Sequence, residues 1–136
     1  MNQTLKTLVS QANGGFTFLD GEVEKFSLQQ DWDTSSDFKV RLILEELILN
    51  ALSYGGNDNE ATVTITDEST RIVMVIEDQG IAFNPLEDAK SADTKAEVED
   101  RDIGGLGVHL VKSMANELSY QRTDDKNILT VVLAKD

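Results

Sequence analysis

Two stretches in the first half of the chain have the spacing of apolar residues that predicts helices. Residues 14–30 form a short amphipathic pattern, and residues 38–54 are apolar around most of the circumference of a helix, which indicates a largely buried helix. The polar segment 31–37 between them has turn chemistry and can supply the N-cap of the second helix. The apolar positions of the first pattern are Phe18, Leu19, Val23 and Phe26.

Strand patterns account for most of the remaining apolar residues. One segment alternates between apolar residues and threonines, and the next is apolar at consecutive positions, so the two should pair as an antiparallel hairpin. The expected strands lie at residues 4–11, 61–66 and 71–78, and in a second hairpin at 117–136 with its turn at 124–127. Together the elements predict an α+β fold, a two-layer sandwich of a mixed, mostly antiparallel sheet with helices on one face.

Size and composition narrow the class of protein. The chain has 136 residues, enough for one hydrophobic core, so we expect one domain over residues 1–136. It lacks cysteine, which excludes disulfides and thiolate metal sites. No apolar run approaches the roughly 18 residues of a membrane span and no secretory signal opens the sequence, so we expect a cytoplasmic protein. The net charge of −13 opposes nucleic acid and anionic membranes as partners.

The second helix carries two polar stripes. Asp37, Arg41 and Glu45 fall on one stripe, which is most simply solvent-facing with Arg41 paired to its acidic neighbours. Glu46 and Asn50 fall on another, where a carboxylate and a carboxamide among apolar neighbours cost free energy unless they meet partners. This second stripe is either another polar edge or a functional pair. In the functional interpretation Glu46 orients or deprotonates a nucleophile, and the carbonyl oxygen of Asn50 suits Mg²⁺.

Asp78 ends an apolar strand, and Gly80 follows two residues later. Strand alternation puts Asp78 on the same face as Met74 and Ile76. A carboxylate there can accept a hydrogen bond from an exocyclic amine such as that of adenine, and Gly80 lets a flat ring approach the backbone. Asp and Gly are also ordinary turn residues at strand ends, so the pattern alone leaves both interpretations open.

Three glycines follow a long acidic connection and precede an apolar helical run that should end near Asn116; they are Gly104, Gly105 and Gly107. A helix N-terminus exposes unpaired N–H groups, and glycines there let phosphate oxygens come close. The cluster is not a Walker A loop, because no Lys-Ser/Thr follows it. The alternative is a tight junction between a loop and a helix. The connection, residues 84–102, carries seven acidic and three basic residues and is longer than compact domains usually keep without a purpose.

Taken together and in order, these pieces resemble the motifs of the Bergerat-fold ATPases, the superfamily that contains gyrase, histidine kinases and DNA-repair ATPases. The segment from Glu46 to Asn50 resembles the N box, the segment from Asp78 to Phe83 resembles the G1 box, and the sequence GGLG resembles the G2 box. The similarity extends from about residue 36 to the C-terminus. A chain of this size is most similar to the anti-sigma factor serine/threonine kinases of bacterial partner-switching systems.

The resemblance implies an ATP held with Mg²⁺ between sheet and helices, under a lid at about residues 84–103. Glu46 would be the base for a serine or threonine hydroxyl, Asn50 would ligate Mg²⁺, and Asp78 would accept from the adenine amino group. The further nucleotide contacts that it implies are Gly80, Arg101 near the γ-phosphate, Gly104, Gly105, Leu106, Gly107, Val108 and, through water, Thr130. His109, the one histidine of the chain, is not expected to be a phosphoacceptor.

The leading functional hypothesis is therefore a kinase that phosphorylates a small antagonist protein and binds a second partner, with a sigma factor as the candidate. The resemblance also suggests a homodimer. A second hypothesis is a nucleotide-gated protein-binding module without phosphotransfer. A third is an α+β domain whose glycines form only a loop.

Overall fold

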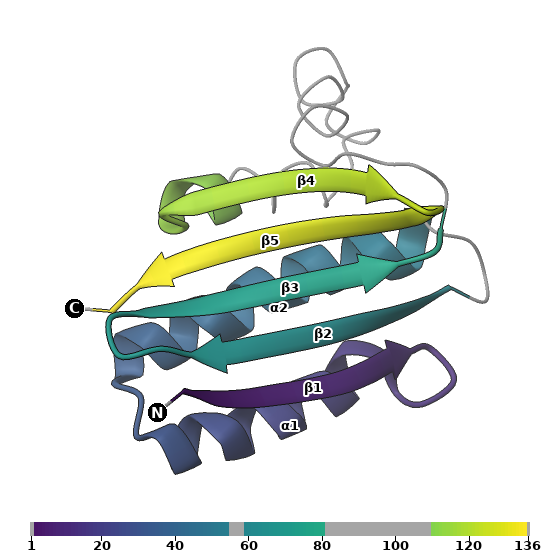
Figure 1. The fold of residues 1–136 in the computed structure, drawn as a ribbon. Coiled ribbons are helices and arrows are strands. Elements are labelled where there is room, and N and C mark those ends of the chain that lie inside the picture. The colour runs from purple at the N-terminus through teal and green to yellow at the C-terminus, as the bar shows by residue number, and fades with distance from the viewer. Residues whose placement is uncertain (1, 55–58, 81–109, 136) are drawn as a thin grey trace, which may run out of the picture.

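Five strands form one sheet in the computed structural model, which describes residues 2–54, 59–80 and 110–135, without the side chains of residues 53 and 54 (Figure 1). The elements in chain order are β1 (Gln3–Ser10), α1 (Gly15–Gln30), α2 (Thr34–Tyr54), β2 (Glu60–Asp67), β3 (Arg71–Asp78), β4 (Glu117–Thr123) and β5 (Lys126–Ala134). The strand order is β1-β2-β3-β5-β4, and every pairing among these strands is antiparallel. The two-layer α+β prediction is confirmed, with a described sheet that is antiparallel throughout rather than mixed.

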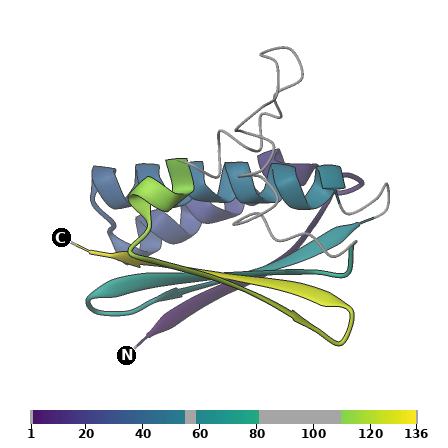
Figure 2. The same cartoon turned by 90° about the horizontal axis from the view of Figure 1, so that it is seen from above.

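Helices α1 and α2 cover the same face of the sheet, and no helix among the described residues covers the other face, here called the open face (Figure 2). The covered face is built by strand alternation, which buries every second side chain of β2, β3 and β5 against the helices. The fully buried side chains of this core include Ile43, Leu44, Ile48, Ile65, Ile72, Met74 and Leu133. In the described ranges, no helix has both the length and the apolar character needed to cross a bilayer.

A tight turn with two glycines joins β1 to α1. The side chain of Asn13 accepts a hydrogen bond from the Ser10 N–H at 2.9 Å and donates to the Leu8 carbonyl at 2.8 Å. Gly14 and Gly15 then adopt φ angles of 111° and 59°, a region that favours glycine because it has no Cβ. The predicted helix is confirmed, although Phe18 is 37% exposed whereas the other three apolar positions of the predicted pattern are buried.

The N-cap of α2 is Asp33, within the turn segment that was predicted to supply it. The Ser36 N–H donates to Asp33 Oδ1 at 2.7 Å, and this hydrogen bond is the main reason why the pKa of Asp33 is lowered. The helix consequently begins at Thr34, four residues before the apolar pattern that predicted it.

Arg41 joins the two helices. Its guanidinium donates to both carboxylate oxygens of Asp20 on α1, at 2.7 and 2.8 Å, and more weakly to Asp37 at 3.4 Å. The sequence predicted that Arg41 pairs with the acidic residues of its own helix. This prediction is wrong about the main partner of Arg41, which is Asp20 on α1. Two parallel hydrogen bonds from a guanidinium to a carboxylate are the strongest geometry for such a pair, which explains why the contact between helices prevails.

Removal of this pair is expected to destabilise the protein in a pH-dependent way. The hydrogen bonds from Arg41 hold the pKa of Asp20 below its ordinary 3.8. A lowered folded-state pKa means that the stabilisation is present above the unfolded pKa and is lost as the pH falls through the folded pKa. Asp20→Asn should therefore lower the free energy of unfolding by about 1 kcal/mol at pH 7, and the difference from wild type should disappear in strong acid.

Urea denaturation at several pH values measures this effect. The matched control is Glu22→Gln on the same helix, which removes an exposed pair to Lys25 at 3.7 Å and should cost less than about 0.5 kcal/mol. Equal losses in the two variants, or a difference for Asp20→Asn that persists at low pH, would contradict the role assigned to the pair.

The C-terminal hairpin turns through two aspartates. Asp124 and Asp125 have φ angles of 52° and 63°, as a two-residue type I′ turn requires, so β5 begins already at Lys126. The turn predicted at residues 124–127 is therefore shorter than expected, and Asn127 lies within the sheet. Residues 110–114 are helical, with Val111 fully buried, which confirms the predicted end of the third helix.

Candidate functional site

The functional residues that the structure describes lie at one end of the sandwich. The C-terminal half of α2 lies behind the sheet at the end where β3 finishes and where the β4–β5 hairpin turns (Figure 1). This arrangement brings the Glu46–Asn50 segment and Asp78 to the same end of the molecule. The side chain of Asn59, which donates to the Ala51 carbonyl at 2.8 Å, ties the start of β2 to α2 there.

Glu46 is a half-buried carboxylate with an unsatisfied oxygen. Its Oε2 is buried and has no hydrogen-bond partner in the described part of the chain. Burial raises the pKa of Glu46, and the charge of Glu45 raises it further. A carboxylate in this environment is a stronger base than one in water, which favours the functional interpretation of the stripe over a second solvated edge.

Asn50 is 5% exposed, and its Nδ2 has no partner among the described residues. No described hydrogen bond fixes the orientation of the amide, so its carbonyl oxygen can be presented to a cation. Carboxylate and amide oxygens are the ligands that Mg²⁺ prefers, and Mg²⁺ commonly takes few protein ligands and keeps several waters. The donor set of this part of α2 therefore fits a magnesium ion.

Asp78 is on the helix-covered face, as strand alternation predicted. It pairs with Ala61 of β2 and Asn127 of β5, both of which are buried on that face. Its Oδ1 accepts hydrogen bonds from the Gly80 N–H at 2.8 Å and from Asn127 Nδ2 at 3.0 Å. Within the described residues, Oδ2 accepts no hydrogen bond and so remains available to a ligand.

Three residues that were not singled out from the sequence hold Asp78 and Gly80 in place. Asn127 Oδ1 accepts from the Tyr120 hydroxyl and from Arg122 Nη1, the latter at 3.2 Å. Arg122 Nη1 also donates to the Gly80 carbonyl at 2.9 Å. The sequence could have indicated this group only through the pairing of the two predicted hairpins. In the observed pairing, β5 lies beside β3 in the register that places Asn127 opposite Asp78.

Thr130 does not reach this group. It pairs with Val75 and Ser119, and alternation along β5 directs it to the face opposite that of Leu129 and Val131. The proposed water-mediated contact with an adenine site beside Asp78 is therefore not supported, because the sheet separates the two side chains. Asn127, three residues earlier and on the covered face, occupies the position beside Asp78 instead.

The remaining predicted positions lie outside the described residues. They are the lid at about residues 84–103 with Arg101, the glycine segment Gly104, Gly105, Leu106, Gly107 and Val108, the motif residue Phe83, and His109. Their roles remain expectations from the sequence.

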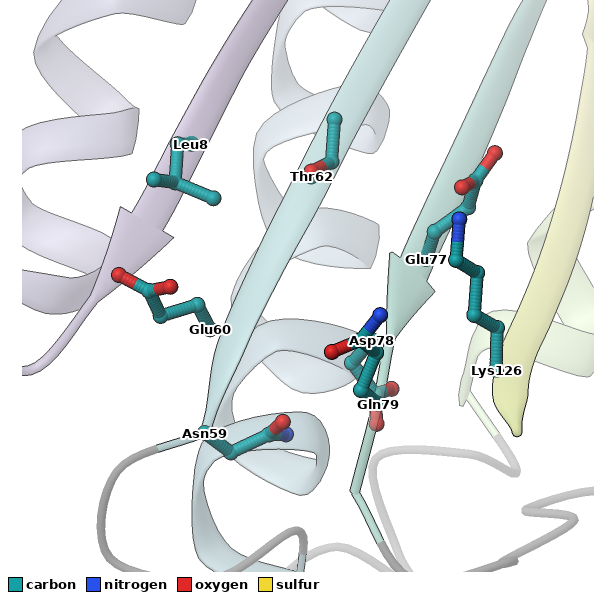
Figure 3. A pocket seen from close by; sticks show the side chains of 8 residues that line it. All are labelled: Leu8, Asn59, Glu60, Thr62, Glu77, Asp78, Gln79 and Lys126. Atoms are coloured by element: carbon teal, nitrogen blue, oxygen red, sulfur yellow. The ribbon is translucent and has the colours of Figure 1, made fainter. Parts of the chain in front are cut away.

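A hollow of about 410 Å³ opens at the same end of the sheet but on its open face (Figure 3). Glu77 and Thr62 line it from neighbouring strands, and Asp78 also lines it. The other lining residues are Leu8, Asn59, Glu60, Gln79 and Lys126. Helix α2 lies behind the strands in this view, and neither Glu46 nor Asn50 is among the residues that line the hollow, so the hollow does not by itself form a site with them.

Solved structures with a similar fold include histidine kinases and the catalytic domain of one of them. The catalytic domain of histidine kinase ThkA matches with a TM-score of 0.57 at 11% identity, covering 96% of this chain and 98% of that domain. The blue-light activated histidine kinase EL346 of Erythrobacter litoralis matches with a TM-score of 0.56 at 18% identity, over 76% of this chain. The chain spans only 31% of that kinase, so this match concerns one part of the larger protein. At these identities the likeness establishes the fold alone.

Sequence comparison adds a protein kinase and a family. The serine/threonine-protein kinase BtrW of Bordetella bronchiseptica is 28% identical over 112 residues, which cover 80% of this chain and 78% of BtrW. The family model of the histidine kinase-like ATPase domain matches residues 21–133, which include the Glu46–Asn50 segment, Asp78 and the glycine segment. The structural and sequence matches agree with the Bergerat-fold motifs, and this chain belongs to the histidine kinase-like ATPase domain family.

Proposed function

We propose that this protein is a magnesium-dependent protein kinase that transfers the γ-phosphoryl group of ATP to a serine or threonine hydroxyl of a partner protein. The observation that carries the proposal is the pair Glu46 and Asn50. Each has a buried side-chain atom without a partner in the described ranges, and both belong to the part of α2 that lies at the same end of the sheet as Asp78. Unpaired buried polar groups are costly, so their retention here is best explained by a ligand.

Each described residue has one role in this proposal. Asp78 Oδ2 accepts from the amino group of adenine, and the Asn50 carbonyl oxygen ligates Mg²⁺, which when bound neutralises phosphate charge. Glu46 accepts the proton of the attacking hydroxyl as its oxygen forms a bond to the γ-phosphorus. The bond from that phosphorus to ADP breaks, and ADP leaves with the bond's electron pair. Because burial raises the pKa of Glu46, its carboxylate is a stronger proton acceptor than a carboxylate in water.

We further propose that the partner is a small antagonist protein in a partner-switching system, with a sigma factor as the second partner. The similarity to BtrW, which is named a serine/threonine-protein kinase, supports a hydroxyl rather than a histidine as the acceptor. The lid at about residues 84–103, Arg101 and the glycine segment 104–108 complete the nucleotide site in this proposal, within one domain.

Nucleotide binding is expected to raise the melting temperature. A ligand at 100 times its dissociation constant stabilises the native state by about 2.7 kcal/mol, which for a chain of this size is on the order of 5–10 °C. Differential scanning fluorimetry with and without millimolar Mg-ATP measures the shift, and incubation with γ-labelled ATP and the candidate antagonist detects the phosphoprotein. A shift without a phosphoprotein would favour a nucleotide-gated binding module. No shift in wild type would overturn both ATP-dependent functions.

A further inference from the structure

A closed ring of hydrogen bonds surrounds the end of β3 and draws on three strands. Asp78 Oδ1 accepts from Gly80 and Asn127, and Arg122 Nη1 donates to both the Gly80 carbonyl and Asn127 Oδ1. The Tyr120 hydroxyl supports the ring from β4 by donating to the same oxygen of Asn127. Local turn chemistry at Asp78 and Gly80 would need only the first of these contacts, so the residues from β4 and β5 require another explanation.

Chemistry permits only one orientation of the Asn127 amide. A carboxylate only accepts hydrogen bonds and a guanidinium only donates them, so Nδ2 must face Asp78 and Oδ1 must face Arg122. Asn127 is 7% exposed, and turning its amide would make two part-buried polar contacts repulsive. The amide is therefore a rigid donor at a fixed place beside the carboxylate.

Two donors on Oδ1 also fix the carboxylate of Asp78. Rotation of the carboxylate would break the hydrogen bonds to Gly80 at 2.8 Å and to Asn127 at 3.0 Å together. Oδ2 is left as an acceptor with a defined direction, and no described residue donates to it. A ligand that meets Oδ2 must bring its own donor.

We infer that Asn127 is a positioning residue that sets the nucleobase specificity of the site, so that it selects a 6-amino purine over a 6-oxo purine. The inference rests on the proposed function, because it assigns a role within the same nucleotide site. A 6-amino group donates to Oδ2, whereas a 6-oxo group would place an acceptor against an acceptor. Sites built around a fixed hydrogen-bond partner reject analogues that lack the complementary group, because the polar atom of the site is then left unpaired. A carboxylate that is free to turn would let water intervene and would discriminate less.

The ratio of the dissociation constants of ITP and ATP, both as magnesium complexes, tests this role. ITP carries a 6-oxo group and otherwise the same sugar and phosphates. In wild type this ratio should be well above one, because ATP binds more tightly than ITP. Asn127→Leu should reduce the ratio at least tenfold. Tyr120→Phe removes only the hydroxyl that supports the amide and should reduce the ratio by a smaller factor. Isothermal titration calorimetry gives the ratios, and thermal unfolding reports the fold of each variant.

Asn116→Leu is the matched control. The Asn116 side chain also braces β5, by accepting from the Ala134 N–H at 2.8 Å, but it does so at the end of the sheet away from Asp78. It should lower the melting temperature and leave the ratio unchanged. The inference about Asn127 is overturned if the ratio is unchanged in folded Asn127→Leu, or if it falls equally in Asn116→Leu. Either result would leave the proposed function standing. If Asn127→Leu does not fold, an unchanged ratio in Tyr120→Phe overturns the inference. Failure of wild type to bind either nucleotide overturns the proposed function as well.

Discussion

Glu46→Gln is expected to slow phosphotransfer to the partner protein by about 100- to 10,000-fold, the usual contribution of a positioned general base. Glutamine keeps the size of the side chain but cannot accept the proton of the attacking hydroxyl. ATP affinity should change little, because the proposed contact with the adenine ring is made by Asp78 and not by Glu46. Single-turnover transfer of γ-labelled phosphate, measured beside calorimetric ATP binding, separates the two effects.

The same substitution should stabilise the folded protein at neutral and alkaline pH. Burial raises the pKa of Glu46 above its ordinary 4.5. A raised folded-state pKa means that the favourable contribution is present below the unfolded pKa and is lost as the pH rises through the folded pKa. The neutral amide of glutamine does not lose stability in this way as the pH rises. At pH 8 the free energy of unfolding of the variant should therefore exceed that of wild type by about 1 kcal/mol, the lower end of the cost of an unsatisfied buried polar group.

Glu45→Gln is the control for both measurements. It removes a charge from the adjacent position and leaves Glu46 in place, so transfer should stay within about threefold of wild type, by the scale of other surface substitutions. If Glu46→Gln transfers phosphate as fast as wild type, Glu46 is not the base. If it is less stable than wild type at pH 8, the carboxylate has a partner that stabilises its charged form.

Asp78→Asn is expected to weaken ATP binding by about 100-fold and to strengthen ITP binding relative to ATP. The Gly80 and Asn127 N–H groups require an oxygen where Oδ1 lies, so the introduced amide must place its NH₂ group where Oδ2 lies. This NH₂ group opposes the amino group of adenine but can donate to a 6-oxo group. A 100-fold change corresponds to about 2.7 kcal/mol, which is within the range for a hydrogen bond to a charged group.

Glu77→Gln is the matched control for this loss. It neutralises the neighbouring residue of the same strand, whose side chain lines the hollow on the open face (Figure 3). ATP affinity should therefore remain within about twofold of wild type, because only a screened long-range charge is removed. Equal weakening in Glu77→Gln and Asp78→Asn would show that net charge and not a specific hydrogen bond governs binding. Calorimetric titration of both nucleotides measures each case.

The elements of this fold could be predicted because each has a local period. The alternation of Val63 and Ile65 with threonines is sufficient to predict a half-buried strand. The apolar residues around the circumference of the helix at 38–54 are sufficient to predict a buried helix. The three motifs that resemble the N, G1 and G2 boxes, in this order, were sufficient to predict the family. The match of the family model over residues 21–133 confirms this prediction. Where local signals compete, as at the start of α2, the capping side chain of Asp33 decided the boundary rather than the apolar pattern.

The site could be predicted only in part, because its partners come from distant segments. The turn chemistry of residues 124–127 is compatible with more than one hairpin register, and a shift of one residue moves every side chain to the other face. The turn pattern assigns Asn127 to a turn, and the resemblance to the Bergerat-fold ATPases assigns Thr130 to the site, whereas the observed register places the two side chains on opposite faces. Arg41 likewise found its main partner on α1, 21 residues away in sequence.

By itself the sequence determined the helices and strands, the motif residues Glu46, Asn50 and Asp78, and the family, because periodicity and short motifs are properties of neighbouring residues. Only the tertiary structure decided that Glu46 is a half-buried acid with one unsatisfied, buried oxygen rather than part of a solvated edge, and that Asn127 fixes the carboxylate of Asp78. Burial and strand register depend on contacts between segments far apart in the chain, and no local pattern encodes which polar side chains will share one face.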